Sequence, residues 1–289
     1  MTALLACDLD QTLIFSRHHF HLVPGVPEPE IALVERIDGV PSAYSSAASL
    51  RLLAALHRTA VFVPVTTRTL AQYQRIDLGV RPRYAVAANG GHLLVDGVPD
   101  PAWAAEVAAR LAGACAPLAE MAALAGELGA EEWVRLVREA DGLFVYLVAH
   151  TREAIPDLTR VAERVAAGGW ALSRQGRKVY LVPEPLTKQT AVAEVARRAG
   201  ATRVFAAGDS VLDLPMLTAA DRAVRPAHGE LHEQGWQAPH LTVTGARGLL
   251  AADELLGLLD AWVRSPCTAA PSTAAPSTAA PSTAAPVQP

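Results

Sequence analysis

The sequence is poor in aromatic residues and cysteine. Of its 289 residues only 5% are aromatic, whereas 51% are hydrophobic, so the core must be built mainly from aliphatic side chains. The three cysteines, Cys7, Cys115 and Cys267, are odd in number and widely spaced. This pattern argues against a disulfide framework and against a zinc site, and it predicts a reducing, cytoplasmic environment.

The chain also lacks a strong charge of either sign and any long apolar run. Twenty-five Lys and Arg against 29 Asp and Glu give a formal charge of −4, which excludes a strongly cationic nucleic-acid surface. No run of about 18 apolar residues exists, so no membrane span is expected. The first residues have no basic segment and reach Asp8 early, unlike a signal peptide. We therefore expect no nucleic-acid partner and no membrane partner.

The C-terminal segment, 265–289, repeats Ala-Ala-Pro-Ser-Thr and carries no charge. Frequent prolines exclude a continuous helix, and the composition cannot form a core. We expect a disordered tail, which is favoured over a tether or partner-binding element. The remaining 264 residues are long enough for about two domains.

The hydrophobic pattern predicts an α/β fold. Short apolar runs at 3–7, 60–65, 84–88, 204–207, 223–225 and 241–243 are typical of buried strands. Predicted helices at 46–56, 69–78, 187–199, 212–220 and 249–263 alternate with them. This alternation predicts a Rossmann-like, doubly wound parallel sheet with right-handed crossovers.

The middle of the chain has a different character. Predicted strands at 92–95, 143–149, 170–174 and 178–182 are mixed with predicted helices at 101–129, 131–139 and 153–167. Such mixing favours an α+β unit inserted into the parallel-sheet domain. We expect a core made of 1–90 and 185–264, and an inserted cap domain at 91–184.

The first chemical motif, Asp8-Leu9-Asp10-Gln11-Thr12, follows the first strand. In open α/β sheets, ligands bind at the carboxyl ends of the strands. Two carboxylates at such a position are costly unless they hold a cation or take part in chemistry. An Asp-rich turn is the simpler alternative for this motif alone.

Three further motifs follow predicted strands or begin predicted helices. Thr66-Thr67-Arg68 offers hydroxyls and backbone N–H groups to an anion, although for this motif alone ordinary helix capping is the favoured explanation. Lys188 begins a helix, where it either is solvated or lies over a phosphate. Asp209 and Asp213 add two acids at the same edge of the sheet. Four acids at one place, Asp8 and Asp10 included, favour a Mg²⁺ site.

The order of these motifs resembles the haloacid dehalogenase (HAD) superfamily of phosphotransferases. Its four motifs match Asp8-Leu9-Asp10-Gln11-Thr12, Thr66, Lys188 and the segment from Gly208 to Asp213. Asn89-Gly90-Gly91 and Asp213-Leu214-Pro215-Met216-Leu217 are similar to the branch with a C2-type cap, which includes Cof-like, sucrose-phosphate and mannosyl-3-phosphoglycerate phosphatases. The long stretch between Thr66 and Lys188 leaves room for such a cap.

The resemblance implies a phosphatase of a small phosphorylated metabolite, a sugar or sugar-acid phosphate. It assigns Asp8 as the nucleophile and Asp10 as the general acid and base. Thr66 and Lys188 would hold the phosphoryl group. Mg²⁺ would be held by Asp8, the backbone carbonyl of Asp10, Asp209 and Asp213. The expected substrate-binding residues are Thr67, Arg68, Asn89, Gly90, Arg174 and Lys178.

Several features leave alternatives open. The chain has Gln11 where the family commonly has Gly, Leu212 where it often has Asn, and Thr beside Thr66 where relatives usually have Gly or Ser. A phosphomutase or a non-catalytic phospholigand-binding scaffold would use the same fold. A signalling receiver domain is disfavoured by Asp10 and by the Gly208–Asp213 segment. Arg174, Arg177 and Lys178 are equally explained as surface charges of a hairpin. The histidines at 18, 19 and 21 favour a cleft-lining loop over a transition-metal site.

Overall fold

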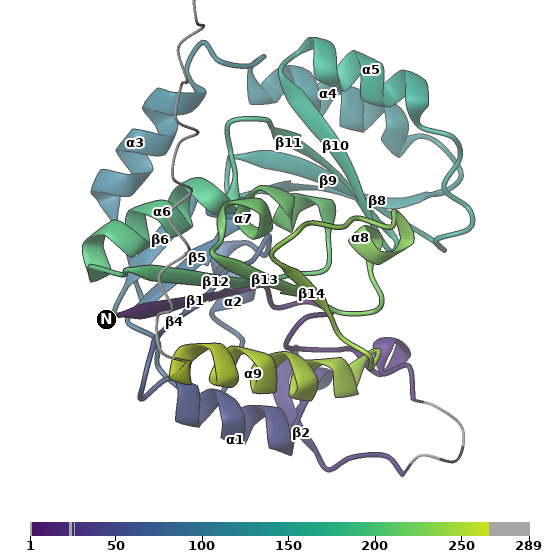
Figure 1. Cartoon of the computed structure of the whole chain (residues 1–289). Coiled ribbons are helices and arrows are strands. Elements are labelled where there is room, and N and C mark those ends of the chain that lie inside the picture. Colours follow the sequence, from purple (N-terminus) through teal and green to yellow (C-terminus); the bar gives the residue numbers. More distant parts are fainter. Residues whose placement is uncertain (1, 23–24, 26, 266–289) are drawn as a thin grey trace, which may run out of the picture.

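The computed structural model describes residues 2–22, 25 and 27–265, so the predicted tail lies outside the described residues except for Ser265. A parallel sheet has the strand order β14-β13-β12-β1-β4 (Figure 1). Its strands are β1 (Ala3–Cys7), β4 (Val61–Pro64), β12 (Arg203–Ala207), β13 (Arg222–Arg225) and β14 (Leu241–Val243). The predicted Rossmann-like core is confirmed.

Helices cover both faces of this sheet because its strands are apolar on both sides. Leu5 of β1 packs in one cluster with Leu53 of α1 (Ala47–Leu56) and Leu256 of α9 (Leu249–Arg264). On the opposite face, Leu4 belongs to a cluster with residues of α6 (Lys188–Ala199) and α7 (Leu214–Ala219). Figure 1 shows α1 and α9 below the sheet and α6 and α7 above it. Adjacent residues of β1 therefore pack into two separate hydrophobic clusters, one on each face of the sheet.

The third predicted strand leaves the parallel sheet. β5 (Tyr84–Ala87) touches it through a single parallel bridge between Val65 and Val86, and pairs instead with β6 (His92–Val95). β6 also pairs with β7 (Val98–Pro99). The following helix, α3 (Pro101–Leu111), stays beside the core because Asp100 at its start forms an ion pair with Arg198 of α6.

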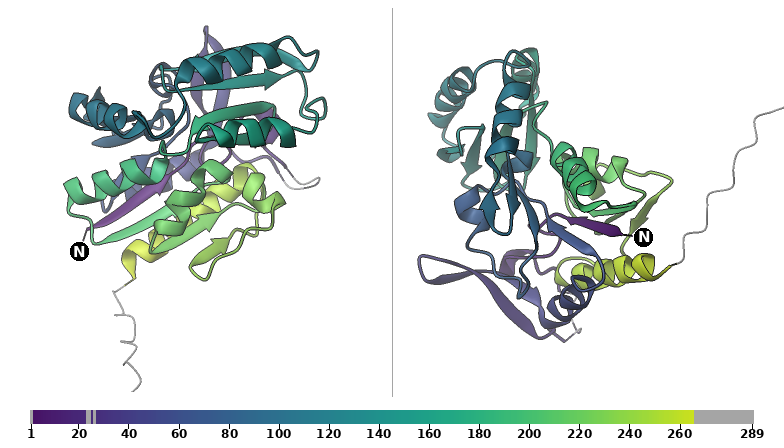
Figure 2. Two further views of the ribbon diagram at one scale, coloured as in Figure 1. Left: turned by 90° about the horizontal axis from the view of Figure 1, so that it is seen from above. Right: turned by 90° about the vertical axis from the view of Figure 1, so that its left-hand side faces the viewer.

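A β-hairpin that the hydrophobic pattern did not predict precedes α1. It consists of β2 (Ile31–Ile37) and β3 (Val40–Ser46) and projects from the core (Figure 2). Asp38 and Gly39 form its turn with φ of 50° and 79°. Two consecutive positive φ angles match the turn type that Asp-Gly favours between antiparallel strands. That dipeptide was the sequence signal for the hairpin.

The insert contains a four-stranded antiparallel sheet with the order β10-β11-β9-β8. Its strands are β8 (Val134–Ala140), β9 (Phe144–Ala149), β10 (Trp170–Gln175) and β11 (Lys178–Pro183), and α4 (Leu118–Gly129) and α5 (Thr159–Ala167) pack against it. The predicted helix at 131–139 is wrong, because this segment forms β8 and pairs with β9. Long-range pairing, such as that of Val137 with Leu147, outweighs the local helical pattern.

Two predicted helices are shorter in the structure. The helix expected at 69–78 is only α2 (Leu70–Tyr73), since the Asp77 backbone N–H donates to the Val34 carbonyl of the hairpin at 2.9 Å. The helix expected at 153–167 begins at Thr159, after Pro156. The core also contains a short helix, α8 (Glu230–Glu233). No helix among the described residues is both long and apolar enough to cross a membrane.

Gly90 gives a test of the packing where the chain leaves the core. Its φ is +101°, and a Cβ there would lie 2.2 Å from the Thr187 carbonyl oxygen. We expect Gly90→Ala to lower the free energy of unfolding by more than ~2 kcal/mol, because a backbone atom cannot move aside as a side chain can. Urea unfolding measures this loss.

Gly97→Ala is the matched control. Gly97 has φ of +82° with nothing within 4 Å of an added Cβ, so only backbone strain of ~1 kcal/mol is expected. Equal losses in the two variants would show that close packing against Thr187 is not what requires glycine at position 90.

Candidate functional site

The predicted site residues converge at the carboxyl edge of the parallel sheet. Asp8 directly follows β1, Thr66 follows β4 and Asp209 follows β12, while Lys188 begins α6. Parallel strands end at the same edge of a sheet, so residues far apart in sequence meet there. Asp213 joins them from the turn after Asp209.

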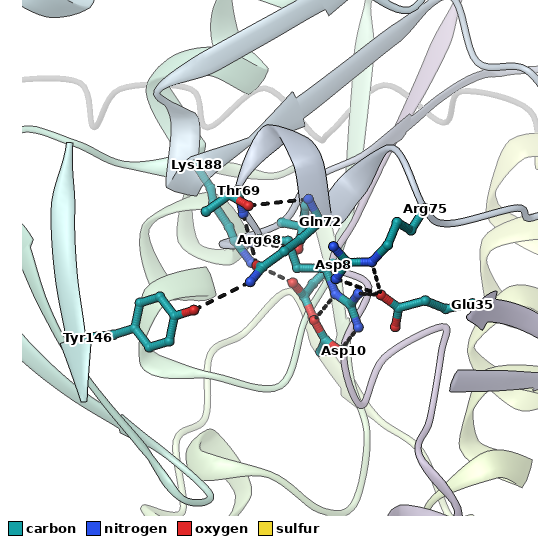
Figure 3. Close-up of polar contacts among 10 residues, drawn as sticks. Asp8, Asp10, Glu35, Arg68, Thr69, Gln72, Arg75, Tyr146 and Lys188 are labelled. Atoms are coloured by element: carbon teal, nitrogen blue, oxygen red, sulfur yellow. Dashed lines mark hydrogen bonds and ion pairs between the residues drawn. The ribbon is translucent and has the colours of Figure 1, made fainter. Parts of the chain in front are cut away.

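Lys188 forms the centre of this cluster. Its side chain is 1% exposed, and its Nζ lies 2.6 Å from Asp8 Oδ1 and 2.5 Å from Asp213 Oδ1 (Figure 3 shows the contact with Asp8). Burial opposes the charge, but the two carboxylates hold the pKa of Lys188 above its usual range. Burial also raises the pKa of Asp8 to about 7, although Lys188 offsets part of the effect. The Lys188 ammonium thus forms ion pairs with both Asp8 and Asp213, whose carboxylates would otherwise repel each other.

The acids near Lys188 fit a divalent cation. Asp8, Asp209 and Asp213 each offer a carboxylate oxygen within 4.8 Å of the others. The carboxylate of Asp209 accepts no hydrogen bond from the described residues, and burial, followed by the charge of Asp8, raises its pKa well above the usual value. When all three carboxylates are ionised, the single ammonium leaves a net charge of −2, which a divalent cation would balance. Buried carboxylate oxygens without protein donors are the ligands that Mg²⁺ prefers.

Asp213 differs from Asp209 because its second oxygen is already occupied. Asp213 Oδ2 accepts hydrogen bonds from the backbone N–H groups of Asp209 and Ser210 at 3.2 and 3.0 Å, and from the Ser210 hydroxyl at 2.8 Å. These bonds fix the turn that carries Asp209. Asp213 therefore organises the cluster, whereas Asp8 and Asp209 present the freer oxygens.

Asp10 belongs to a second charge network. Arg68 donates from Nε and Nη2 to the two Asp10 oxygens at 2.7 and 2.8 Å, and from Nη1 to Glu35 at 2.7 Å (Figure 3). Burial acts to raise the pKa of Asp10, but the charge and hydrogen bonds of Arg68 hold it well below its usual range. Arg75 also donates to Glu35, at 3.2 Å. The two acids of the first motif therefore lie in opposite electrostatic environments.

Glu35 was not predicted as a site residue. It lies on β2 with a side chain 1% exposed, at an irregularity in the pairing with β3. Its Oε2 is buried and has no hydrogen-bond partner among the described residues. No sequence motif marked this residue, and only the unrecognised Asp-Gly hairpin signal pointed to its segment.

Two of the expected substrate-binding residues, Asn89 and Gly90, support the backbone near the site. The buried amide of Asn89 donates to the Leu186 carbonyl at 2.7 Å, and the Gly90 carbonyl accepts a bond from Trp103 at 2.8 Å. Both contacts fix the segment that leads to Lys188. Thr67 lies half-buried next to Thr66, whose hydroxyl accepts the Arg68 backbone N–H at 3.1 Å.

One face of the cap sheet lies towards the core. Register pairing places Tyr146 of β9 opposite Tyr180 of β11, with Lys178 on the same face two residues away. Gln72 of α2 donates to the Tyr146 hydroxyl at 3.4 Å, so this face of the cap looks onto the core (Figure 3). Lys178 is thus brought to the site.

Arg174 and Arg177 are not brought to the site. Arg174 pairs with Val179, on the opposite face of the sheet from Lys178, and donates to the Arg152 carbonyl at 2.8 Å. Arg177 is exposed at the hairpin turn and donates to the His150 carbonyl at 3.4 Å. Of the three basic residues near this turn, Lys178 is the one that shares a sheet face with Tyr180 and Tyr146.

The histidine loop after the first motif packs against the core. His228 is 2% exposed, its Nε2 donates to the Gln11 carbonyl at 2.8 Å, and its Nδ1 accepts the Gly248 N–H at 3.0 Å. Burial lowers the pKa of His228 to about 4, so the ring is neutral. His21 packs against it with ring centroids 5.5 Å apart. Among the described residues, no set of three metal-ligating groups includes a histidine.

The bond from His228 also holds an unusual backbone conformation. Gln11 has φ of 60°, in the left-handed region that favours glycine. Members of the family that the sequence resembles commonly have Gly at this position. Gln11 therefore adopts the turn conformation that places Asp10 near Arg68. The hydrogen bond from His228 to the Gln11 carbonyl holds this conformation.

Comparison with known proteins identifies the fold. No family model matches the sequence, and no curated protein matches it. A solved structure of a sucrose-phosphatase from Synechocystis sp., in complex with sucrose and phosphate, is 16% identical, covers 90% of this chain and 99% of its own, and has a TM-score of 0.63.

Two further structures give the same result. A phosphatase of the HAD superfamily from Bacteroides thetaiotaomicron is 16% identical over 91% of this chain and 96% of its own, with a TM-score of 0.53. A HAD subclass IIB sugar phosphatase is 14% identical over 91% and 99%, with a TM-score of 0.54. Over about nine-tenths of its length, the chain therefore has the fold of the HAD-superfamily phosphatases, a Rossmann-like core with an inserted cap.

Proposed function

We propose that the protein is a Mg²⁺-dependent phosphomonoester hydrolase that acts on a small phosphorylated metabolite through an aspartyl-phosphate. The observation that carries this proposal is the buried cluster of Asp8, Lys188 and Asp209 at the carboxyl edge of the sheet. The fold shared with sugar phosphatases supports it. The half-buried Tyr146, on the face of the cap sheet that lies towards the core, offers apolar surface to a sugar or sugar acid.

Asp8 is the nucleophile in this proposal. A carboxylate oxygen of Asp8 attacks phosphorus, a P–O bond to Asp8 forms, and the bond to the ester oxygen breaks. Lys188 places a positive charge beside Asp8, and Thr66 offers a hydroxyl, so both reduce repulsion by the incoming phosphoryl oxygens. When bound by Asp8, Asp209 and the Asp10 carbonyl, with Asp213 beside them, Mg²⁺ would neutralise further charge on these oxygens.

Asp10 moves the protons. It donates a proton to the departing ester oxygen, and then accepts one from the water that attacks the aspartyl-phosphate, which regenerates Asp8 and releases inorganic phosphate. The first step needs Asp10 in its protonated form, whereas Arg68 keeps it ionised in this structure. The mechanism therefore requires the contact between Asp10 and Arg68 to loosen when the ester binds.

Removal of the Asp8 carboxylate tests the reaction. Asp8→Asn is expected to lower Mg²⁺-dependent phosphate release by at least ~10³-fold, because the amide cannot form the aspartyl-phosphate. The measurement is inorganic phosphate release from a panel of phosphorylated metabolites, with Mg²⁺ and with EDTA. Asp38→Asn, in the hairpin turn, is the control and should retain full activity.

The same assay separates the alternatives. Full activity of Asp8→Asn would contradict the assignment of the nucleophile. Transfer of phosphate between positions of a sugar without release would indicate a phosphomutase. Absence of any turnover by the unaltered protein, with metal present, would indicate a non-catalytic phospholigand-binding scaffold.

The pH dependence of stability tests the metal site. The pKa of Asp8 is about 7 in the folded, metal-free protein, above its value near 4 in an unfolded chain. The folded form therefore keeps a proton that the unfolded form loses, and the metal-free protein loses stability as pH rises from about 4 to about 7. Mg²⁺ competes with that proton. We expect the increase in Tm with millimolar Mg²⁺ to be small near pH 5 and larger near pH 8.

Thermal melts with Mg²⁺ and with EDTA across this pH range measure the effect. Asp209→Asn should abolish most of the increase, since it removes the carboxylate that lacks a protein donor. An increase that is the same at every pH, or that survives in Asp209→Asn, would show that Mg²⁺ stabilises the protein elsewhere.

A further inference from the structure

We propose that Lys178 and Gln175, side by side on the core-facing surface of the cap sheet, bind a second anionic group of the substrate. The preferred phosphoester would then carry a carboxylate or a second phosphate at its far end. This inference rests on the proposed phosphatase function and adds the class of leaving group.

The strand register places the two side chains together. Gln175 of β10 and Lys178 of β11 are directly paired across the hairpin, so their side chains lie on one face of the sheet. Tyr180, two residues along β11, shares that face and pairs with Tyr146. Because Tyr146 reaches Gln72 of the core, this face of the cap sheet lies towards the core (Figure 3).

In the described part of the chain, the buried amide N–H of Gln175 lacks an acceptor, and Lys178 lacks an acidic partner within the ion-pair distance of 4.0 Å. Buried donors without acceptors are costly, and a ligand that supplies the acceptor removes the cost. A cation beside an amide N–H matches the oxygens of a carboxylate or a phosphate.

The Lys178 charge is held in place and stays available. Its Nζ lies 5.8 and 5.9 Å from the ring centroids of Tyr146 and Tyr180, within the range of cation–π attraction. Tyr180 and Asp10 raise the pKa of Lys178 against the opposing effect of burial, so the group is protonated at neutral pH. Asp10 compensates the Lys178 charge only in part, since both oxygens of Asp10 are also bonded to Arg68.

Lys178 and Gln175 lie in a different domain from the residues that would hold the transferred phosphoryl group. Lys188 and Thr66 lie in the core and contact or flank Asp8. Lys178 and Gln175 lie on the cap, beyond Asp10, which donates the proton to the leaving oxygen. A substrate that spans the core and the cap therefore places its leaving group, and not its reacting phosphate, against the cap pair.

Matched substrates test the proposal. Glycerol 3-phosphate and 3-phosphoglycerate, or sorbitol 6-phosphate and 6-phosphogluconate, differ chiefly in a carboxylate. We expect the unaltered enzyme to have the lower KM for the carboxylate member. Lys178→Met should raise the KM for the carboxylate member by about 10- to 100-fold more than the KM for the member without the carboxylate, the range of a charged hydrogen bond, because any effect through Asp10 is common to both substrates.

Two other variants make the result specific. Gln175→Leu should raise the KM for the carboxylate member by a smaller factor, because it removes a neutral donor. Arg174→Met alters the same strand on its opposite face and should change neither substrate. An equal loss on both members of a pair in Lys178→Met would overturn the proposal, since Lys178 would then serve the reacting phosphoryl. Unchanged kinetics in both Lys178→Met and Gln175→Leu would overturn it as well.

A binding experiment keeps this inference distinct from the proposed function. Phosphonoacetate and methylphosphonate cannot be hydrolysed, and only the first carries a carboxylate. Calorimetry should show tighter binding of phosphonoacetate to the unaltered protein, and Lys178→Met should remove the difference. If no phosphoester is hydrolysed but this preference is found, the catalytic proposal fails and the anion site stands. If both phosphonates bind equally, the anion site fails whatever the activity.

Discussion

The site depends on one buried ammonium. Lys188 contacts Asp8 and Asp213, and Asp209 lies close enough for all three acids to share an ion. Without this positive charge, three neighbouring carboxylates at a buried sheet edge would repel one another, and protonation would relieve the repulsion. Loss of one partner from a buried ion pair is also strongly destabilising. Lys188 therefore supports both the packing of the sheet edge and the ionised state of the nucleophile.

A second cation gives Asp10 a different environment. Arg68 holds both oxygens of Asp10 and is itself held by Glu35 from the β2–β3 hairpin. The pKa of Asp8 is raised and that of Asp10 is lowered, although only one residue separates them in sequence. Such a separation of two neighbouring carboxyl groups is how a site assigns different tasks to chemically identical side chains. Glu35 thereby extends the site into a hairpin with no motif of its own.

The parts of the fold and site that depend on short local residue patterns could be predicted from the sequence. Apolar runs followed by Asp8, Thr66 and Asp209 placed the motif residues at strand ends, and the structure brings Asp8, Asp209 and Lys188 together. Glu35 escaped prediction because its partners lie more than 30 positions away. The local pattern of segment 131–139 predicts a helix. Its conformation is instead determined by pairing with β9, which a local pattern cannot show.

The strand register explains why the sequence alone could not show which basic residue of the cap faces the core. Arg174 and Lys178 carry the same charge, and both lie close to the hairpin turn in sequence. Only the pairing of Arg174 with Val179, and of Gln175 with Lys178, decides which side chain faces the core. A shift of one residue would exchange them. Composition and spacing could therefore propose both residues, whereas the geometry of the sheet selects one.

The central position of β1 has a consequence for synthesis of the protein. β1 lies between β4 and β12, and Asp8 is separated from Lys188 by 180 positions. On the ribosome, the N-terminal strand emerges first but must wait for almost the whole chain before its second neighbour is available. Pairings of such long range form slowly and leave strand edges open in the meantime. A polypeptide truncated before β12 would thus carry the nucleophile without the strand and the acids that make it reactive, so premature termination yields no partly active enzyme.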